Sequence, residues 1–149
     1  MPVGGQRIDI FGRCRREEKM SFSMNYTLEA DTERNIMREK IYGIWNAAVA
    51  REYSEEYKKL AEPLIEKGNW SKLIDLNNWK SSYPEVVEII GDRLRWCREN
   101  GMVHSANIIE NPVTISQLKK MFRLGGTGKI SRIFRNQKDG EVFLTENGF

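Results

Sequence analysis

Hydrophobic and polar residues alternate along the N-terminal part of the chain in a way that predicts two strands. The first strand carries apolar residues at every second position: Phe22, Met24, Tyr26 and Leu28. Residues 36–45 resume an extended pattern after the turn-rich segment 31–35. Such alternation is typical of a half-buried hairpin. Glu39 falls among the apolar residues of the second strand, so the pattern leaves the register of that strand open.

Beyond residue 45 the apolar spacing changes to that of amphipathic helices. Three segments carry apolar residues three or four positions apart: Ala50, Tyr53, Tyr57, Leu60 and Leu64; Val86, Ile90, Leu94 and Cys97; Ile115, Leu118 and Phe122. Asn46 and Asn111 precede the first and third segments as N-caps, and a glycine follows each of the three. A short, weak fourth helix is predicted over residues 139–144, where Gly140 lowers helix propensity.

Short apolar segments separate these helices. Residues 72–76, 103–109 and 130–134 are each bounded by turn signals and read as buried strands. Strands that alternate with helices require crossover connections. A chain of 149 residues is of the size of one domain. We therefore predict a single α/β domain with a mixed, mostly parallel sheet of about five strands and about four helices.

The first 23 residues differ from the rest of the chain. They contain glycines, lack a clear hydrophobic period, and carry more basic than acidic residues. This composition predicts a flexible N-terminal arm over residues 1–23 and a folded domain over residues 24–149. The charged segment 15–19 stands directly before Met20, which raises the hypothesis that translation starts at Met20 or Met24 and that the arm is not native.

Composition excludes several classes of protein. The chain is 40% hydrophobic and 30% charged, and no apolar run approaches the roughly 20 residues of a transmembrane helix. Cys14 and Cys97 form no C-x-x-C pair and lie far from His104, the single histidine. We therefore expect no zinc site, disulfide framework or cofactor. Cys97 is expected to be a reduced, buried thiol in a cytoplasmic protein.

The order of elements, two strands followed by three helix and strand units and a closing helix, resembles a known family. It is similar to the SpoIIAA-like domains, the STAS-like group related to bacterial anti-sigma-factor antagonists. The likeness covers residues 26–144 and rests on four segments in succession: RNIMREKIYGIWN, WSKLIDLNNWKSSYPEV, RLRWCRENGM and ISRIFRNQKDGEVFL. The resemblance implies a SpoIIAA-like fold and a non-catalytic regulatory or scaffolding module that binds a protein partner.

Ser81 and Ser82 lie where the resemblance implies a regulatory serine. In the anti-sigma antagonists, a partner kinase phosphorylates a serine at the start of the corresponding helix. This chain departs from that pattern, because Lys80 stands where an acidic residue is expected. Ser82 and Glu85 instead match an S-x-x-E capping box. The sequence favours Ser82 as a helix cap, and a phosphorylation site stays open because a helix N-terminus tolerates phosphate.

Polar residues follow two of the predicted parallel strands. Asp75 and Asn77 come after one strand, and Glu110 follows the next. Open α/β sheets bind ligands at the carboxyl ends of their strands, so these three residues form a candidate ligand site. Two carboxylates without a third ligand are a weak metal signal, and asparagine caps explain most of the set.

A basic segment occupies the C-terminal third of the chain. No acidic residue occurs between Glu110 and Asp139, while seven basic residues do. The candidate surface for an anionic partner is formed by Lys119, Lys120, Arg123 and Lys129. Such a surface attracts an acidic protein, an anionic membrane face or nucleic acid. Nucleic acid is disfavoured, because the two aromatic residues of this segment are needed in the core.

Two functions from different classes follow from these observations. The first is the non-catalytic module with a protein partner, acting as a monomer or a homodimer. The alternative is a small-ligand carrier with an apolar pocket and a basic rim for a lipid or anionic ligand. An apolar cavity of several hundred Å³ near Lys119 and Lys120 would favour the carrier. A filled core would favour the interaction module.

Overall fold

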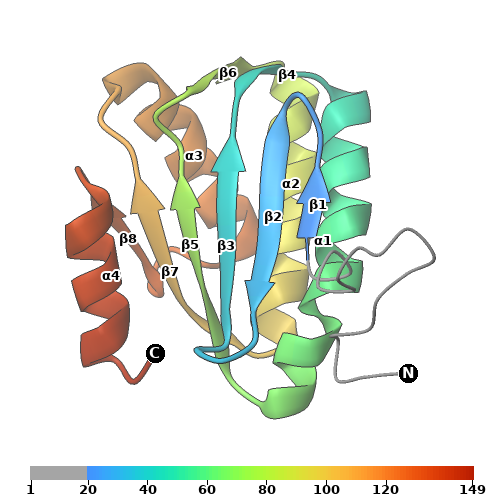
Figure 1. The fold of residues 1–149 in the computed structure, drawn as a ribbon. Helices are drawn as coiled ribbons and strands as arrows, with labels where there is room; N and C mark the ends of the chain where they lie inside the picture. Colours follow the sequence, from blue (N-terminus) through green and yellow to red (C-terminus); the bar gives the residue numbers. More distant parts are fainter. Residues whose placement is uncertain (1–19) are drawn as a thin grey trace.

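The structure is a computed structural model that describes residues 20–149, and its centre is a six-stranded sheet (Figure 1). The strands lie in the order β1-β2-β3-β5-β7-β8, which follows their order along the chain. Their bounds are β1 (Met20–Phe22), β2 (Tyr26–Asp31), β3 (Ile36–Ile41), β5 (Trp70–Asp75), β7 (Met102–Ile108) and β8 (Ser131–Phe134).

The first three strands form an antiparallel meander. β1 pairs with β2, and β2 pairs with β3 so that Leu28 lies opposite Glu39. Buried and half-buried residues alternate strictly along β2, as expected for a strand with one face on the core. The predicted hairpin is present between β2 and β3, with its turn at residues 32–35. Its first strand is shorter than predicted, because residues 23–25 form the β1–β2 turn, and its second strand ends at Ile41.

The remaining strands are parallel and are joined by helices on one face of the sheet. The three connecting helices are α1 (Ala47–Lys67), α2 (Pro84–Glu99) and α3 (Pro112–Gly125). Each crossover leads to the neighbouring strand in the same direction across the sheet. Because such crossovers are right-handed, all three helices cover the same face (Figure 1). The residues predicted to lie inside these helices are buried, except Ile115, which is half-buried.

The C-terminal helix α4 (Gln137–Glu146) covers the opposite face of the sheet, over β5, β7 and β8 (Figure 1). Gly140 allows its close approach, because a Cβ atom there would lie 2.7 Å from Ile108 Cδ1 and 3.3 Å from Leu73 Cδ1. A second, smaller core forms between this helix and the sheet, from Ile36, Leu73, Ala106 and Leu144. The glycine that lowers helix propensity is thus required for packing.

Two short strands form a separate parallel sheet above the carboxyl ends of β3 and β5. They are β4 (Gly43–Trp45) and β6 (Trp79–Ser82), and we call them the lid strands. Figure 1 shows them at the end of the molecule where the β1–β2 turn also lies. The backbone N–H of Tyr83 donates to the carbonyl of Trp45 (2.9 Å), which extends the pairing to the start of α2.

The sequence-based prediction needs two corrections. The sheet has six strands and is mixed rather than mostly parallel, because two of its five pairings are antiparallel. The predicted arm of residues 1–23 extends too far along the chain, because Met20–Phe22 forms the edge strand of the sheet. The rest of the predicted arm, including Cys14, lies outside the described residues. The α/β class, the single domain and the four helices are confirmed.

Within the part of the chain that the structure describes, none of the helices combines the length and the apolar character needed to cross a bilayer.

Candidate functional site

A buried ion pair joins two neighbouring strands on the helix-covered face of the sheet. Glu39 of β3 lies opposite Ile74 of β5, and Lys72 lies two residues before Ile74, so both charged side chains point to the same face. Their Nζ and Oε2 atoms are 3.4 Å apart, and both side chains are buried. The hydroxyl of Tyr53, on α1, donates to the other oxygen of Glu39.

A third charged side chain, Arg93 of α2, reaches the same region from above the sheet. Its guanidinium carbon lies 4.2 Å from the ring centroid of Tyr57 and 4.8 Å from that of Tyr53. Its NH1 atom donates to Cys97 Sγ at 3.6 Å. Cation–π contacts of this kind gain strength when the groups are desolvated. The contacts of the arginine side chain are therefore with two aromatic rings and a sulfur atom, which are polarisable groups.

The protonation states in this cluster follow from burial. Burial raises the pKa values of Tyr53 and Tyr57 well above that of an ordinary tyrosine. The negative charge of Glu39 raises both pKa values further. Burial also raises the pKa of Cys97, so both phenols and the thiol stay neutral near pH 7. Burial lowers the pKa of Lys72, and the charge of Glu39 opposes that shift.

Arg93 remains charged. Burial alone lowers its pKa, but interactions with the surrounding side chains, the Glu39 carboxylate among them, outweigh that effect and hold the pKa above its usual value. Two buried basic side chains thus face one buried carboxylate. With Lys72 protonated, the cluster carries one positive charge in excess, and among the described residues no other buried acidic group lies in it.

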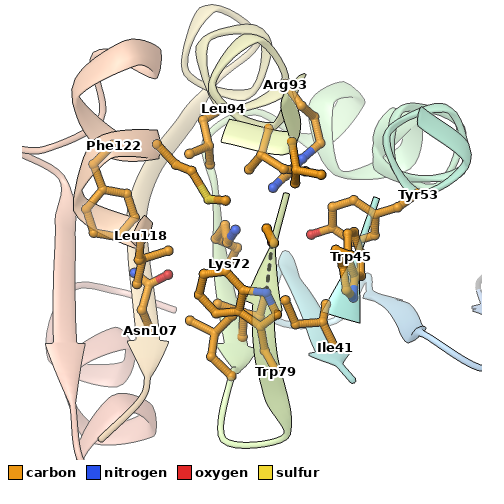
Figure 2. A pocket seen from close by; sticks show the side chains of 16 residues that line it. Ile41, Trp45, Tyr53, Lys72, Trp79, Arg93, Leu94, Asn107, Leu118 and Phe122 are labelled. Carbon is orange, nitrogen blue, oxygen red and sulfur yellow. Dashed lines mark hydrogen bonds between the residues drawn. The ribbon is translucent and has the colours of Figure 1, made fainter. Parts of the chain in front are cut away.

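A cavity of about 30 Å³ lies beside this cluster, between the sheet and helices α2 and α3. Figure 2 shows Lys72, Arg93, Asn107 and Tyr53 around it, with aromatic and aliphatic side chains filling the rest of the wall. The apolar part of the wall includes Trp45, Ile74, Trp79, Val86, Leu118 and Phe122. The cavity lies toward the carboxyl ends of β3, β5 and β7, the usual position for ligands in α/β sheets.

The lid strands close the cavity at that end. Trp45 and Trp79 line it from β4 and β6, and the indole N–H of Trp79 donates to the hydroxyl of Ser82 at 3.0 Å. Gln117 of α3 holds β6 in place: its carbonyl accepts from the Ser82 N–H, and its amide donates to the Ser82 carbonyl, each at 3.1 Å. These bonds fix the lid to the third helix.

The predicted role of Ser82 as a helix cap is wrong. The N-cap of α2 is Tyr83, which makes no side-chain capping bond, and Pro84 occupies the first helical position. Ser82 is instead the last residue of β6, and its hydroxyl is buried against Trp79. Proline lacks an N–H group, so one of the donors that a cap would satisfy is absent. Ser81 is half-buried and pairs with Ile44.

The three residues of the predicted strand-end site do not converge. Asn77 and Glu110 line one shallow depression, with Ile109 and Asn111. Asp75 lines a different groove, on the other face of the sheet, and its carboxylate accepts from the Asn77 N–H at 3.0 Å. Within residues 20–149, no group of three or more histidine, cysteine or acidic side chains is placed to hold a metal ion. The carboxylate of Asp75 acts as a turn cap.

The predicted basic surface is exposed and lies outside the cavity. Lys119, Lys120 and Arg123 project from α3, and Lys129 lies in the loop before β8. Neither Lys119 nor Lys120 lines the cavity. None of the four makes an ion pair with a described residue. The basic surface is thus free to contact a partner.

Sequence reasoning missed the three charged residues of the core. Each interrupts an apolar pattern: Glu39 within β3, Lys72 within the apolar segment WSKLID, and Arg93 within the buried stripe of α2. An isolated charge is usually assigned to solvent, and only the coincidence of three such interruptions on facing elements would have indicated a buried cluster.

No known family model matches the sequence, and no curated protein matches it at a significant level.

Proposed function

We propose that this protein is a non-catalytic interaction module that binds an acidic protein partner. The proposed docking surface consists of Ile44, Tyr83 and Val113 at the lid end, together with the basic residues Lys119, Lys120 and Arg123 of α3. The observation that carries the proposal is the concentration of exposed apolar side chains at this one end, next to an unpaired basic helix face.

The apolar part of the docking surface is unusually exposed. Ile44 is 60% exposed, Tyr83 56% and Val113 68%, and Met24 in the nearby β1–β2 turn is 93% exposed. Hydrogen bonds connect the segments that carry them: Tyr83 pairs with Trp45, next to Ile44, and β6 is bound to α3 through Gln117. Large apolar side chains gathered at one place on a surface are typical of a protein interface.

The basic part of the surface continues along α3. Val113, Gln117, Lys120 and Leu124 recur at three- and four-residue intervals, so they lie on one stripe of the helix. A groove of about 520 Å³ runs beside this stripe, between α3 and α2, and Glu85 and Glu88 line its α2 wall. Lys119 and Arg123 do not line this groove. An acidic partner with an apolar centre would therefore pair with these two residues outside the groove and cover the exposed apolar side chains.

The sequence resemblance to SpoIIAA-like domains favours this function. The proposed docking surface adjoins the start of α2, where the antagonists of that family carry their regulatory serine. A switch at this position would involve Ser81, since the Ser82 hydroxyl is buried. The buried free thiol of Cys97 agrees with a cytoplasmic location.

A lipid carrier is less well supported. Pockets for drug-sized or larger ligands usually hold about 300 to 1,000 Å³. The core cavity holds about 30 Å³, and its polar groups include Lys72, Arg93 and Asn107 but not the exposed lysines of α3. A mostly filled core is the arrangement that favours the interaction module.

The test uses a photo-crosslinking amino acid at Tyr83 and, as a matched control, at Val142. Both side chains are partly exposed, but Val142 lies on α4, on the opposite face of the sheet. We expect the Tyr83 probe to capture one acidic protein in cells of the source organism, and the Val142 probe not to capture it. Purified partner should then bind the wild-type protein with an affinity that falls as salt concentration rises.

Charge-reversal variants distinguish specific binding of an acidic partner from nonspecific binding to the exposed apolar side chains. The variant with Lys119→Glu, Lys120→Glu and Arg123→Glu should fold normally, because these side chains are exposed. It should lose most of the binding, while Lys138→Glu, an exposed change on α4, should not. Equal capture by the Tyr83 and Val142 probes, or capture of a second copy of this chain alone, would overturn the proposal of an acidic partner.

A further inference from the structure

We infer that the core cavity binds one small, planar, monovalent oxyanion that carries an O–H group, the chemistry of bicarbonate. This site is distinct from the proposed docking surface. The inference rests on three features of the cavity: its excess positive charge, its free hydrogen-bonding groups and its size.

The excess charge is the first argument. A buried cation without a counter-charge is strongly unfavourable, and proteins relieve it by pairing or by deprotonation. One oxygen of Glu39 accepts from Tyr53, and the other lies 3.4 Å from Lys72 Nζ but accepts no hydrogen bond from a described residue. Arg93 contacts only neutral groups, two tyrosine rings and a thiol. One bound monovalent anion would neutralise the cluster.

The free groups are the second argument. Arg93 is 2% exposed, yet its Nε atom has no hydrogen-bond partner among the described residues. Lys72, 3% exposed, has Glu39 as its one ion-pair partner there, although an ammonium offers three donors. Both side chains line the cavity, and Figure 2 shows their nitrogen atoms turned toward its centre. These donors are suited to the oxygens of an anion.

Asn107 supplies a free hydrogen-bond acceptor, whereas Arg93 and Lys72 supply donors. Its amide nitrogen donates to Ser105 and to the carbonyl of Arg132, which fixes the orientation of the side chain. Its Oδ1 atom is buried and accepts no hydrogen bond from any residue in the described part of the chain. Figure 2 shows this oxygen on the side of the cavity. A ligand that fits must therefore also donate, which bicarbonate does through its O–H and formate does not.

Size is the third argument. A single water needs roughly 10 to 15 Å³ of cavity volume, so about 30 Å³ holds an ion of three or four heavy atoms. The apolar wall around the donors excludes competing water and strengthens their interaction with a charge. An amino acid, a sugar phosphate or a nucleotide is too large for this cavity.

The experiment titrates the full-length protein with sodium bicarbonate at fixed pH in a closed cell. Sodium gluconate keeps the ionic strength constant, because gluconate is too large to enter. We expect a saturable change in tryptophan fluorescence, since Trp45 and Trp79 line the cavity, and a rise in the unfolding midpoint. Carbon-13 NMR of labelled bicarbonate should show a bound signal at one equivalent. Formate should bind at least about tenfold more weakly.

Two variants test the assignment in different ways. Lys72→Met removes the excess charge and leaves Glu39 facing Arg93, and Leu118→Phe fills the cavity without changing any charge. Both should lose the bound signal, whereas Lys119→Met, an exposed change on α3, should keep it. If one of these two core variants fails to fold, the other variant and the comparison of bicarbonate with formate still test the inference. No saturable effect in the wild type, formate binding as tight as bicarbonate, or binding retained by both core variants would overturn the inference.

Discussion

Glu39 and Lys72 form an ion pair inside the core, with 3.4 Å between Nζ and Oε2, on two parallel strands that neighbour each other in the sheet. Both side chains are almost completely buried. The pair explains why a glutamate stands among the apolar residues of β3 and a lysine among those of β5. Glu39 supplies the counter-charge that a buried lysine needs on the helix-covered face.

Removal of the Glu39 carboxylate alone should therefore be far more harmful than removal of both charges of the pair. Glu39→Gln keeps an acceptor for Tyr53 but leaves two buried cations without a counter-charge, and we expect a loss of about 3 to 5 kcal/mol in the free energy of unfolding. The double variant Glu39→Gln, Lys72→Met should recover most of that loss. Urea denaturation of the single and double variants measures both values.

Lys72→Met alone provides the control. It leaves Glu39 facing Arg93, so charge remains balanced, and it should be milder than Glu39→Gln. A Glu39→Gln variant that loses less than about 1 kcal/mol would show that Lys72 is neutral or hydrated in the folded protein. The excess charge on which the anion site depends would then be absent.

The elements that the sequence predicted well are those that depend on local spacing. The stripe from Ala50 to Leu64 is buried as expected, Asn46 caps its helix, and Asn111 caps α3. Caps and stripes act within a few residues, so the chain specifies them locally. The α/β class followed from the alternation of such elements.

The features that escaped prediction depend on contacts between distant segments. The lid strands have three and four residues, and they form only because β4 meets β6 across more than thirty residues of intervening chain. Ser82 matched a capping box in sequence, but this pairing holds it in a strand. The sequence did not indicate the buried cluster of Lys72 and Arg93, because the groups that they contact lie on other elements.

Gly125 should be essential for the packing of α3 on α2. A Cβ atom at this position would lie 2.7 Å from Leu94 Cβ and 2.8 Å from the Gly91 carbonyl oxygen. A backbone oxygen in a helix cannot move aside without shifting the helix. Gly125→Ala should therefore cost about 1 to 3 kcal/mol, measured as the free energy of unfolding.

Gly128 is the matched control, three residues beyond Gly125 and outside α3. A Cβ atom there would meet no atom within 4 Å, and its backbone φ is outside the left-handed range. Gly128→Ala should be neutral or stabilising by up to about 1 kcal/mol. Equal destabilisation by the two alanines would show that α2 and α3 are less closely packed than the structure indicates.

Ser82 should stabilise the protein through Trp79 and not through the start of α2. Ser82→Ala leaves the buried indole N–H without its acceptor, and we expect a loss of about 1 to 3 kcal/mol. Ser82→Asp should be worse, since it buries a charge, whereas a helix cap would tolerate aspartate. Ser81→Ala should have little effect.

A double-mutant cycle with Trp79→Phe distinguishes the two roles of Ser82. Phenylalanine has no N–H, so Ser82→Ala should lose most of its effect in that background. If the alanine costs the same in both backgrounds, the hydroxyl acts elsewhere, and the bond to Trp79 is not what it contributes.

The last prediction concerns acid stability through Glu141, which binds Arg38 at 2.7 Å and Arg34 at 3.1 Å and so ties α4 to the first hairpin. Burial alone raises the pKa of Glu141, but the hydrogen bond and charge of Arg38, with help from Gln137 and Arg34, lower it below the usual 4.5. A carboxylate with a lowered folded-state pKa stabilises the protein above its usual pKa, and this contribution is lost as pH falls through the lowered value.

Glu141→Gln should therefore cost up to about 1 kcal/mol near neutral pH and progressively less below about pH 4. Glu146→Gln is an exposed change on the same helix, and its difference in unfolding free energy from the wild type should not shrink as pH falls. A difference for Glu141→Gln that stays constant with pH would contradict a stabilising role of the Glu141 carboxylate.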